Sequence, residues 1–328
     1  MKRIPAFWSA GHAALPLLLS PLAALYDLAG RASRSFAQPA RPPVPVVCVG
    51  NVTMGGAGKT PTVIAIAAFL KSRGRRPHIL TRGYGGSARG PLRVDPNHGA
   101  SEVGDEAILL ARVAPTWVGA DRADTARLAV DAGADVLVMD DGFQNVSIAK
   151  DLSFLVVDGG FGLGNGWVFP AGPLRETPQA ALARATAVIY IVDPGGDAAG
   201  PPPRGIERVP LFPAQLEPTP EAALFADQAV VAFAGIGRPK KFFNTLRALG
   251  ANVVGAYAFP DHHAYVPDDL MTLIDDAVAQ DARIVTTEKD AVRLPPEARD
   301  MVEVLRVGLV FEDPKALETM LSPILDDD

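Results

Sequence analysis

The chain has 328 residues, of which 48% are hydrophobic and 21% charged, and its formal net charge is -6. This composition excludes a disordered chain, and the length exceeds one ordinary core, so two domains are expected. The acidic balance argues against a nucleic-acid partner. The single cysteine, Cys48, excludes an intrachain disulfide framework and a cysteine-rich zinc site.

The first forty residues contain a leucine-rich stretch, "HAALPLLLSPLAALYDLAG". A membrane-spanning helix needs about 20 apolar residues, so a full span is not expected. Pro16 and Pro21 are expected to break or kink a single helix. Three interpretations remain open: a signal peptide, a helix packed on the protein's own core, and a helix lying in a membrane surface. Trp8 and Tyr26 are aromatic residues of the kind that suit a membrane interface.

From Pro45 onward, short apolar runs alternate with helical stretches, which is typical of a mostly parallel sheet covered on both faces. Strands are predicted at 44–50, 77–83, 135–142, 153–158 and 187–193. Helices are predicted at 61–74, 105–114 and 125–133, two of them ended by glycine. The expected fold class is α/β.

The composition changes around 194–220, where a Pro/Gly-rich loop precedes a short, proline-interrupted extended segment. A second α/β pattern follows, with strands at 229–237, 252–259, 283–290 and 304–311 and helices at 239–250 and 267–280. We therefore expect an N-terminal membrane-associated segment at 1–40, a main domain at 41–205, a linker at 206–220 and a smaller α/β domain at 221–328.

The stretch "GNVTMGGAGKTP" lies between a predicted strand and a predicted helix, where a phosphate-binding loop belongs. Its glycines can turn successive backbone N–H groups toward an anion. Lys59 can reach the β- and γ-phosphates, and the Thr60 hydroxyl can ligate Mg²⁺. The usual G-x-x-x-x-G-K-[ST] pattern has glycine where this chain has Thr53. The candidate ATP-binding residues are Thr53, Met54, Gly55, Gly56, Ala57, Gly58, Lys59 and Thr60. Because ATP is cytosolic, this loop disfavours the signal peptide.

Acidic residues follow two predicted segments of the main domain. Asp140 and Asp141 end a hydrophobic strand, where ligands bind in open α/β sheets and where an acid commonly holds Mg²⁺. Adjacent strand residues point to opposite faces, so at most one continues inward unless the strand has ended. A simple turn is the alternative. The candidate magnesium ligands are Thr60, Glu106, Asp140 and Asp141.

Asp105 begins a predicted helix, and N-capping would by itself explain it, with Glu106 stabilising the helix dipole. The functional interpretation pairs Asp105 with one histidine of "FPDHHAY", His262 or His263, as a base near a phosphoryl acceptor. Such a pair would form only when two domains close. Arg82 and Arg175 lie in glycine- or proline-rich loops and can pair with phosphate oxygens. Lys289 can contact an anionic ligand or end a strand.

Together, these stretches resemble the tetraacyldisaccharide 4'-kinase family of bacterial lipid A biosynthesis. The resemblance runs from Val46 to Leu294 through seven stretches in family order: "GNVTMGGAGKTP", "LTRGYGG", "VGDEA", "DDGFQ", "GNGWVFPAGPLRE", "FPDHHAY" and "TTEKDAVRL".

The resemblance implies a P-loop kinase that uses ATP and Mg²⁺ and phosphorylates the 4'-hydroxyl of a tetraacylated glucosamine disaccharide 1-phosphate, giving lipid IVA. It implies a catalytic pair of Asp105 with His262, or with its neighbour His263, and places Asp140 and Asp141 near magnesium. Arg175 and Lys59 complete the implied catalytic set. The implied location is the cytoplasmic face of the inner membrane. Since a four-chain lipid cannot leave the bilayer cheaply, the resemblance favours a membrane-interface helix at the N-terminus.

Two other functions remain open. The loop x-G-G-x-G-K-T also resembles that of ParA-like NTPases, which act as partner-binding switches, although Met54 stands where many of them carry a lysine. A soluble small-molecule kinase is the third alternative, but it leaves the leucine-rich N-terminus without a role.

Overall fold

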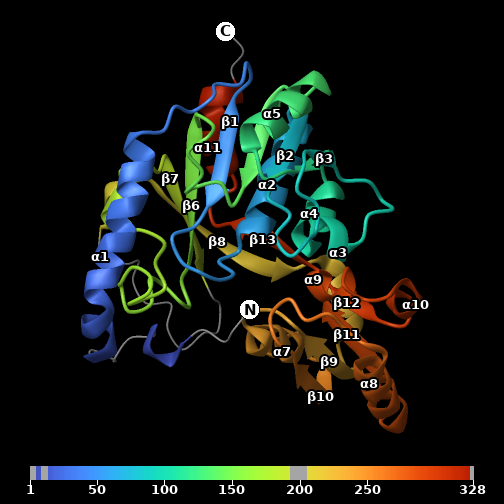
Figure 1. Cartoon of the computed structure of the whole chain (residues 1–328). Helices are drawn as coiled ribbons and strands as arrows, with labels where there is room; N and C mark the ends of the chain where they lie inside the picture. Colours follow the sequence, from blue (N-terminus) through green and yellow to red (C-terminus); the bar gives the residue numbers. More distant parts are fainter. Residues whose placement is uncertain (1–4, 9–13, 193–204, 326–328) are drawn as a thin grey trace.

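The computed structural model describes residues 5–8, 14–192 and 205–325. The predicted Pro/Gly-rich loop lies mostly in 193–204, outside the described residues. In the described part, a large sheet of nine strands has the order β13-β8-β7-β6-β1-β5-β2-β4-β3 (Figure 1). Its strands are β1 (Val46–Gly50), β2 (Pro77–Thr81), β3 (Leu92–Arg93), β4 (Thr116–Val118), β5 (Val136–Asp140), β6 (Leu152–Asp158), β7 (Ala187–Val192), β8 (Leu211–Pro218) and β13 (Val307–Phe311). Only β3 and β13 run antiparallel to their neighbours, so the predicted mostly parallel sheet is confirmed.

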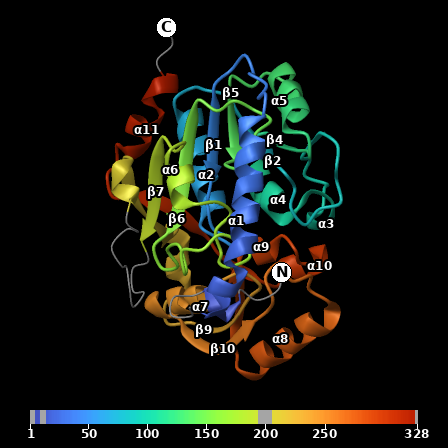
Figure 2. The same ribbon diagram turned by 60° about the vertical axis from the view of Figure 1, so that its left-hand side comes forward.

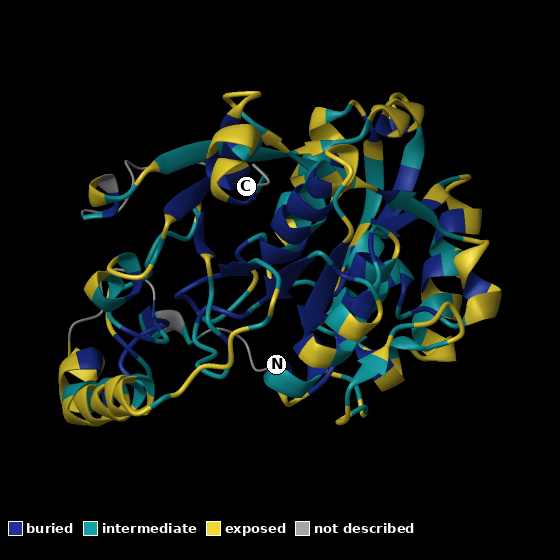
Figure 3. Ribbon diagram, turned by 90° about the horizontal axis from the view of Figure 1, so that it is seen from above, coloured by how far each residue is buried: buried dark blue, intermediate teal, exposed yellow. Residues whose placement is uncertain are grey.

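Helices cover both faces of this sheet. Alternate residues of β1 point to opposite faces, so Val47 and Val49 join one core while Val46 and Cys48 join the other. The first core packs against α2 (Lys59–Ser72), α4 (Asp105–Ala111) and α11 (Ala316–Leu325). The second packs against α1 (Ala14–Ser35), α5 (Arg122–Asp131) and α6 (Pro178–Leu182). The central strands are therefore buried on both sides, and exposed residues lie on the outer helices (Figure 3).

A smaller sheet lies beside the large one and has the parallel order β10-β9-β11-β12. Its strands are β9 (Ala229–Ala234), β10 (Asn252–Ala258), β11 (Arg283–Thr287) and β12 (Glu303–Leu305). Two cores flank it, one packed against α7 (Pro239–Ala248) and the other against α8 (Pro267–Ala279). The short helices α9 (Glu288–Ala291) and α10 (Pro296–Arg299) follow β11 and connect toward β12. The predicted second, smaller α/β unit is present.

The domain boundaries expected from the sequence do not coincide with the limits of the two sheets. The expected linker 206–220 contains β8, which pairs with β7 inside the large sheet. The segment predicted as one strand at 304–311 forms two strands on either side of Arg306, β12 in the small sheet and β13 in the large one. Apolar residues run through 304–311 and are interrupted only by Arg306 and Gly308, so periodicity could not reveal the break. The described remainder is the short helices α3 (Ala100–Val103), η1 (Ala6–Trp8), η2 (Ile206–Arg208) and η3 (Pro220–Phe225).

Pro16 and Pro21 were expected to break or kink the N-terminal helix; they do not break it, because α1 is continuous over 22 residues. Pro16 lies in the first turn, where its missing N–H has no partner to lose. Pro21 would leave the Leu17 carbonyl without its helical donor, and the Ser20 hydroxyl donates to that carbonyl at 2.8 Å. Helix α1 runs along the large sheet (Figure 2). Within the described residues, no helix is long and apolar enough to cross a membrane.

The two aromatic residues expected at a membrane interface differ in their surroundings. Trp8 is buried, packs edge-on against Phe169 and donates from Nε1 to the Pro170 carbonyl at 3.2 Å. Trp8 therefore anchors the N-terminal segment to the protein, and the expectation for this residue was wrong. Tyr26 on α1 is 40% exposed.

Candidate active site

The loop between β1 and α2 has the backbone of a phosphate-binding turn. Gly55 and Gly58 have φ values of 129° and 84°, in the left-handed region that favours glycine. A second segment supports the loop, because the Met54 N–H donates to the Pro173 carbonyl at 2.8 Å and the Arg175 N–H donates to the Val52 carbonyl at 2.7 Å. The N-terminal end of α2 is thereby fixed beside the turn, ready to receive an anion.

We expect Gly58→Ala to lower the free energy of unfolding by about 2 to 4 kcal/mol and to weaken ATP binding. The reason is its positive φ together with a Cβ that would lie 2.2 Å from Ile191 Cδ1. Gly56→Ala is the matched control, since its Cβ meets nothing within 4 Å. Urea unfolding and ATP titration measure both effects; equal stability of the two variants would contradict the assigned loop geometry.

A charged cluster lies against this loop. The chain turns at Asp141, whose φ of 50° ends the strand, so Asp140 and Asp141 both remain at the site. The Lys59 ammonium lies 3.7 Å from Asp141 Oδ1 and donates to Asn51 Oδ1 at 3.3 Å. Arg175 forms a two-pronged pair with Asp141, at 2.9 and 3.2 Å. Although burial opposes its ionisation, Lys59 and Arg175 hold the pKa of Asp141 below its ordinary value.

Asp140 has one carboxylate oxygen with a partner and one without. Oδ2 accepts a hydrogen bond from the Thr81 hydroxyl at 3.1 Å, whereas the buried Oδ1 has no hydrogen-bond partner. Burial, together with the nearby carboxylates of Glu106 and Asp141, raises the pKa of Asp140 to about 7. A buried, unpaired carboxylate oxygen beside a phosphate loop is what a divalent cation would satisfy.

No cluster of three or more His, Cys, Asp and Glu side chains in the described part of the chain could hold a metal ion. A nucleotide-dependent Mg²⁺ does not need such a cage, because phosphate and water oxygens supply most of its ligands. The residues present therefore fit magnesium bound together with a nucleotide.

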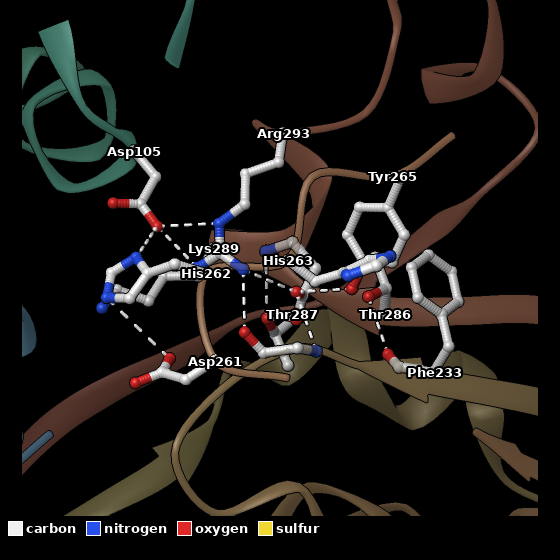
Figure 4. Close-up of polar contacts among 12 residues, drawn as sticks. Asp105, Phe233, Asp261, His262, His263, Tyr265, Thr286, Thr287, Lys289 and Arg293 are labelled. Carbon is white, nitrogen blue, oxygen red and sulfur yellow. Dashed lines mark hydrogen bonds and ion pairs between the residues drawn. The ribbon is translucent and has the colours of Figure 1, made fainter. Parts of the chain in front are cut away.

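Asp105 and His262 meet across the two sheets (Figure 4). His262 Nδ1 lies 3.0 Å from Asp105 Oδ2, and Asp105 is 4% exposed. Asp105 is the first residue of α4 and Gly104 holds the capping position, so the simple N-cap interpretation was wrong. His262 takes a φ of 59°, an uncommon conformation for a residue with a side chain. His263 instead bonds Asp269 at 2.8 Å, which leaves His262 as the partner of Asp105.

Two basic residues after β11 complete the cluster. Lys289 lies 2.5 Å from Glu106, and Arg293 lies 2.5 Å from Asp105. The sequence left Lys289 as a contact for an anionic ligand or as a strand end; in the structure it pairs with Glu106. The sequence offered no sign of Arg293, because nothing in the pattern indicates which arginine will face a buried acid in another part of the chain.

The site therefore lies where the carboxyl ends of β1 and β5 face the small sheet. The loop lysine and the strand-end acids belong to the large sheet, whereas His262, Lys289 and Arg293 come from the small one. The two groups adjoin at α4, because Glu106 pairs with Lys289 at 2.5 Å and its charge also acts on Asp140. Arg82 follows β2 and is exposed. Such an arrangement can hold a triphosphate and present a carboxylate–imidazole pair to an acceptor.

Known proteins similar to this chain indicate the kind of acceptor that such a site serves. The family model described as "Tetraacyldisaccharide-1-P 4'-kinase" matches residues 15–326. The chain belongs to this family. Among its relatives is the tetraacyldisaccharide 4'-kinase of Gluconacetobacter diazotrophicus, 53% identical over 98% of this chain and 98% of the relative. That of Rhodospirillum centenum is 51% identical over 98% of this chain and 97% of the relative.

A member of the tetraacyldisaccharide 4'-kinase family also has a similar solved structure. The crystal structure of LpxK from Aquifex aeolicus in complex with ATP is 27% identical, with a TM-score of 0.77, and the match covers 95% of this chain and all of that one. The predicted family resemblance and the predicted α/β fold with a P-loop are thus confirmed.

Proposed function

We propose that this chain is an ATP-dependent kinase that transfers the γ-phosphate of ATP to the 4'-hydroxyl of a tetraacyldisaccharide 1-phosphate, forming lipid IVA. The observation that carries this proposal is the Asp105–His262 pair beside the phosphate loop, at 3.0 Å, in a chain that matches the kinase family over 15–326. A nucleotide switch of the ParA type needs no such base. A phosphoryl acceptor does, because its hydroxyl proton must leave as the new bond forms.

The residues divide the work by position. The loop N–H groups from Gly55 to Thr60 bind the triphosphate, and Lys59 neutralises charge on its β- and γ-phosphates. Asp105 receives the proton of the acceptor hydroxyl while His262 holds it in place. Arg175, fixed by Asp141, adds positive charge beside the loop.

Magnesium supplies charge neutralisation of the phosphates when it is bound. Asp140 is the residue best placed to hold it, since its buried Oδ1 has no other partner. Thr60, Asp141 and Glu106 complete the proposed ligand set. Glu106 pairs with Lys289 at 2.5 Å, so it contributes mainly through its charge.

The test is incubation of the purified chain with labelled ATP, Mg²⁺ and the acylated disaccharide 1-phosphate, followed by chromatography of the lipid. A labelled lipid that carries phosphate at the 4' position supports the proposal. Hydrolysis of ATP without a labelled lipid, stimulated by a protein or DNA partner, would support the switch instead.

The lipid acceptor implies that the chain works at a membrane surface, which we place at the cytoplasmic face of the inner membrane. Helix α1 supports this proposal, because it presents a row of exposed leucines: Leu15, Leu17, Leu18, Leu22, Leu25 and Leu28. Leu18 is 75% exposed and Leu25 63% exposed. Water-exposed apolar surface of this extent is typical of a docking face. A lipid surface is the occupant that fits a helix serving an acylated substrate.

We expect the double variant Leu18→Glu/Leu25→Glu to lower affinity for anionic phospholipid vesicles by tenfold or more, since burying a leucine stabilises binding by roughly 1.5 to 3 kcal/mol. Vesicle flotation measures the effect. Val278→Glu/Met301→Glu is the matched control, because it places the same charges on exposed apolar residues of the small-sheet unit. Equal flotation of the two double variants would contradict a membrane role for α1.

A further inference from the structure

The guanidinium of Arg293 lies between two buried carboxylates, that of Asp105 on α4 (Figure 4) and that of Asp290 on α9. The Arg293 side chain is 6% exposed, Asp105 4% and Asp290 0%. Nε and one terminal nitrogen donate to Asp105 Oδ2 at 2.8 and 2.5 Å. The other terminal nitrogen donates to Asp290 Oδ1 at 3.0 Å and to the Gly235 carbonyl at 2.8 Å. One planar group therefore connects the acid of α4 to the small sheet.

Asp290 is itself held firmly. Its Oδ1 accepts hydrogen bonds from the Gly235 N–H at 2.9 Å and the Tyr265 hydroxyl at 2.7 Å. Its Oδ2 accepts from the Thr287 hydroxyl at 2.6 Å. Gly235 follows β9, Tyr265 lies in the loop after β10, and Thr287 is the last residue of β11. The Arg293 guanidinium is therefore fixed relative to three strands of the small sheet.

His262 is held by the same backbone carbonyl as Arg293. The Gly235 carbonyl that accepts from Arg293 accepts from the His262 N–H as well, at 3.1 Å. A side chain at Gly235 would lie 3.0 Å from the Pro260 carbonyl and 3.1 Å from Asp290 Oδ1. Arg293 and His262 thus reach Asp105 from one rigid corner of the small sheet.

This geometry makes the two oxygens of Asp105 unequal. Asp105 Oδ2 accepts hydrogen bonds from Arg293 and from His262 Nδ1. These bonds occupy the lone pairs of Oδ2. Oδ1 accepts from the Glu106 backbone N–H at 2.9 Å and keeps a further lone pair. The Arg293 donors on Oδ2 and the Glu106 N–H on Oδ1 together hold the carboxylate at both oxygens, which a single imidazole bond cannot do.

We propose that Arg293, anchored by Asp290, is a positioning residue that holds Asp105 Oδ2 so that Oδ1 faces the acceptor hydroxyl. This inference rests on the proposed kinase function. In the step it serves, the acceptor oxygen bonds to the γ-phosphorus, its proton passes to Asp105 Oδ1, and the bond to the β,γ-bridging oxygen breaks to release ADP. The base is therefore complete only when the two sheets meet at the Arg293 contact.

The charges around Asp105 agree with this role. Burial opposes its ionisation, but the hydrogen bond from His262 and the charges of Lys289 and Arg293 hold its pKa well below the ordinary value. The carboxylate of Glu106, its neighbour on α4, is paired with Lys289.

The experiment compares Arg293→Gln and Arg293→Lys with the control Arg112→Gln. Arg112 follows α4, pairs with Glu288 across the same junction at 3.9 Å, and makes no contact with Asp105. For Arg293→Gln we expect kcat to fall about a hundredfold with the KM for ATP within threefold. Arg293→Lys keeps the charge but not the planar group that contacts Asp105, Asp290 and Gly235 together, so kcat falls at least tenfold.

A second measurement does not depend on activity. The crystal structure of Arg293→Gln shows whether the Asp105 carboxylate keeps its contacts with His262 Nδ1 and the Glu106 N–H. We expect the carboxylate to leave this position in the variant. If the unmodified chain forms no phosphorylated lipid, the proposed function fails, and this structure still decides whether Arg293 holds Asp105.

Two results would overturn the inference. One is a kcat for Arg293→Lys that lies within twofold of the kcat for Arg112→Gln. The Arg293→Lys variant also decides the question if Arg293→Gln does not fold. The other is an Asp105 carboxylate that lies in the same position with and without the guanidinium, read from the structure of Arg293→Lys if Arg293→Gln does not fold.

Discussion

Replacing Lys59 by alanine is expected to lower phosphoryl transfer by on the order of a thousandfold. Lys59 is 9% exposed, lies at the start of α2 and is the cation that the loop presents to the β- and γ-phosphates. In a partly desolvated site, charge that develops in the transition state is stabilised far more strongly by a fixed ammonium than by water. The measurement is the initial rate of labelled lipid formation at saturating ATP.

Lys71→Ala is the matched control for this prediction. Lys71 lies in the last turn of the same helix and donates to the Val113 carbonyl at 2.7 Å, away from the loop. Its loss should leave the rate within twofold. Turnover retained in Lys59→Ala would show that the triphosphate does not bind at this loop.

Asp105→Ala is expected to lower kcat by about a hundredfold to ten-thousandfold, the usual contribution of a positioned general base. Affinity for ATP should change little, because Asp105 lies on α4 and not in the phosphate loop. Single-turnover rates and nucleotide binding separate the two quantities.

The matched control is Asp121→Ala, at the start of another helix. Asp121 is a true capping residue of α5, where it accepts from the N–H groups of Ala123 and Asp124. Its loss should lower the free energy of unfolding by about 1 kcal/mol and leave kcat unchanged. If Asp105→Ala shows the same pattern as Asp121→Ala, the role of Asp105 is structural only.

The parts of the fold that sequence could predict are those with local, periodic signals. The buried strands around Cys48 and Met139 are continuous apolar runs, and the glycines of the phosphate loop are needed for their backbone angles. The candidate acids could be found because they end a strand or begin a helix. Their assembly was predictable only as a pairing of Asp105 with a histidine doublet.

The rest of the fold and of the site depends on contacts between segments far apart in the sequence, and such contacts leave no periodic pattern. The choice of His262 over His263 is made by backbone turning at φ 59°. The Arg293 and Lys289 pairs join positions more than 180 residues apart. Helix α1 continues through Pro21 because one hydroxyl, that of Ser20, replaces the lost donor.

The way the chain leaves and re-enters the large sheet has a mechanical consequence. β8 ends at Pro218 and β13 begins at Val307, and these two residues are paired. The Thr219 N–H donates to the Arg306 carbonyl at 3.0 Å, so both crossings occur at one corner. The small-sheet unit is thus inserted between two paired strands of the large sheet, and both chain connections lie at one corner. We expect any hinge motion of the unit to occur about that corner and to change the distance between Asp105 and His262.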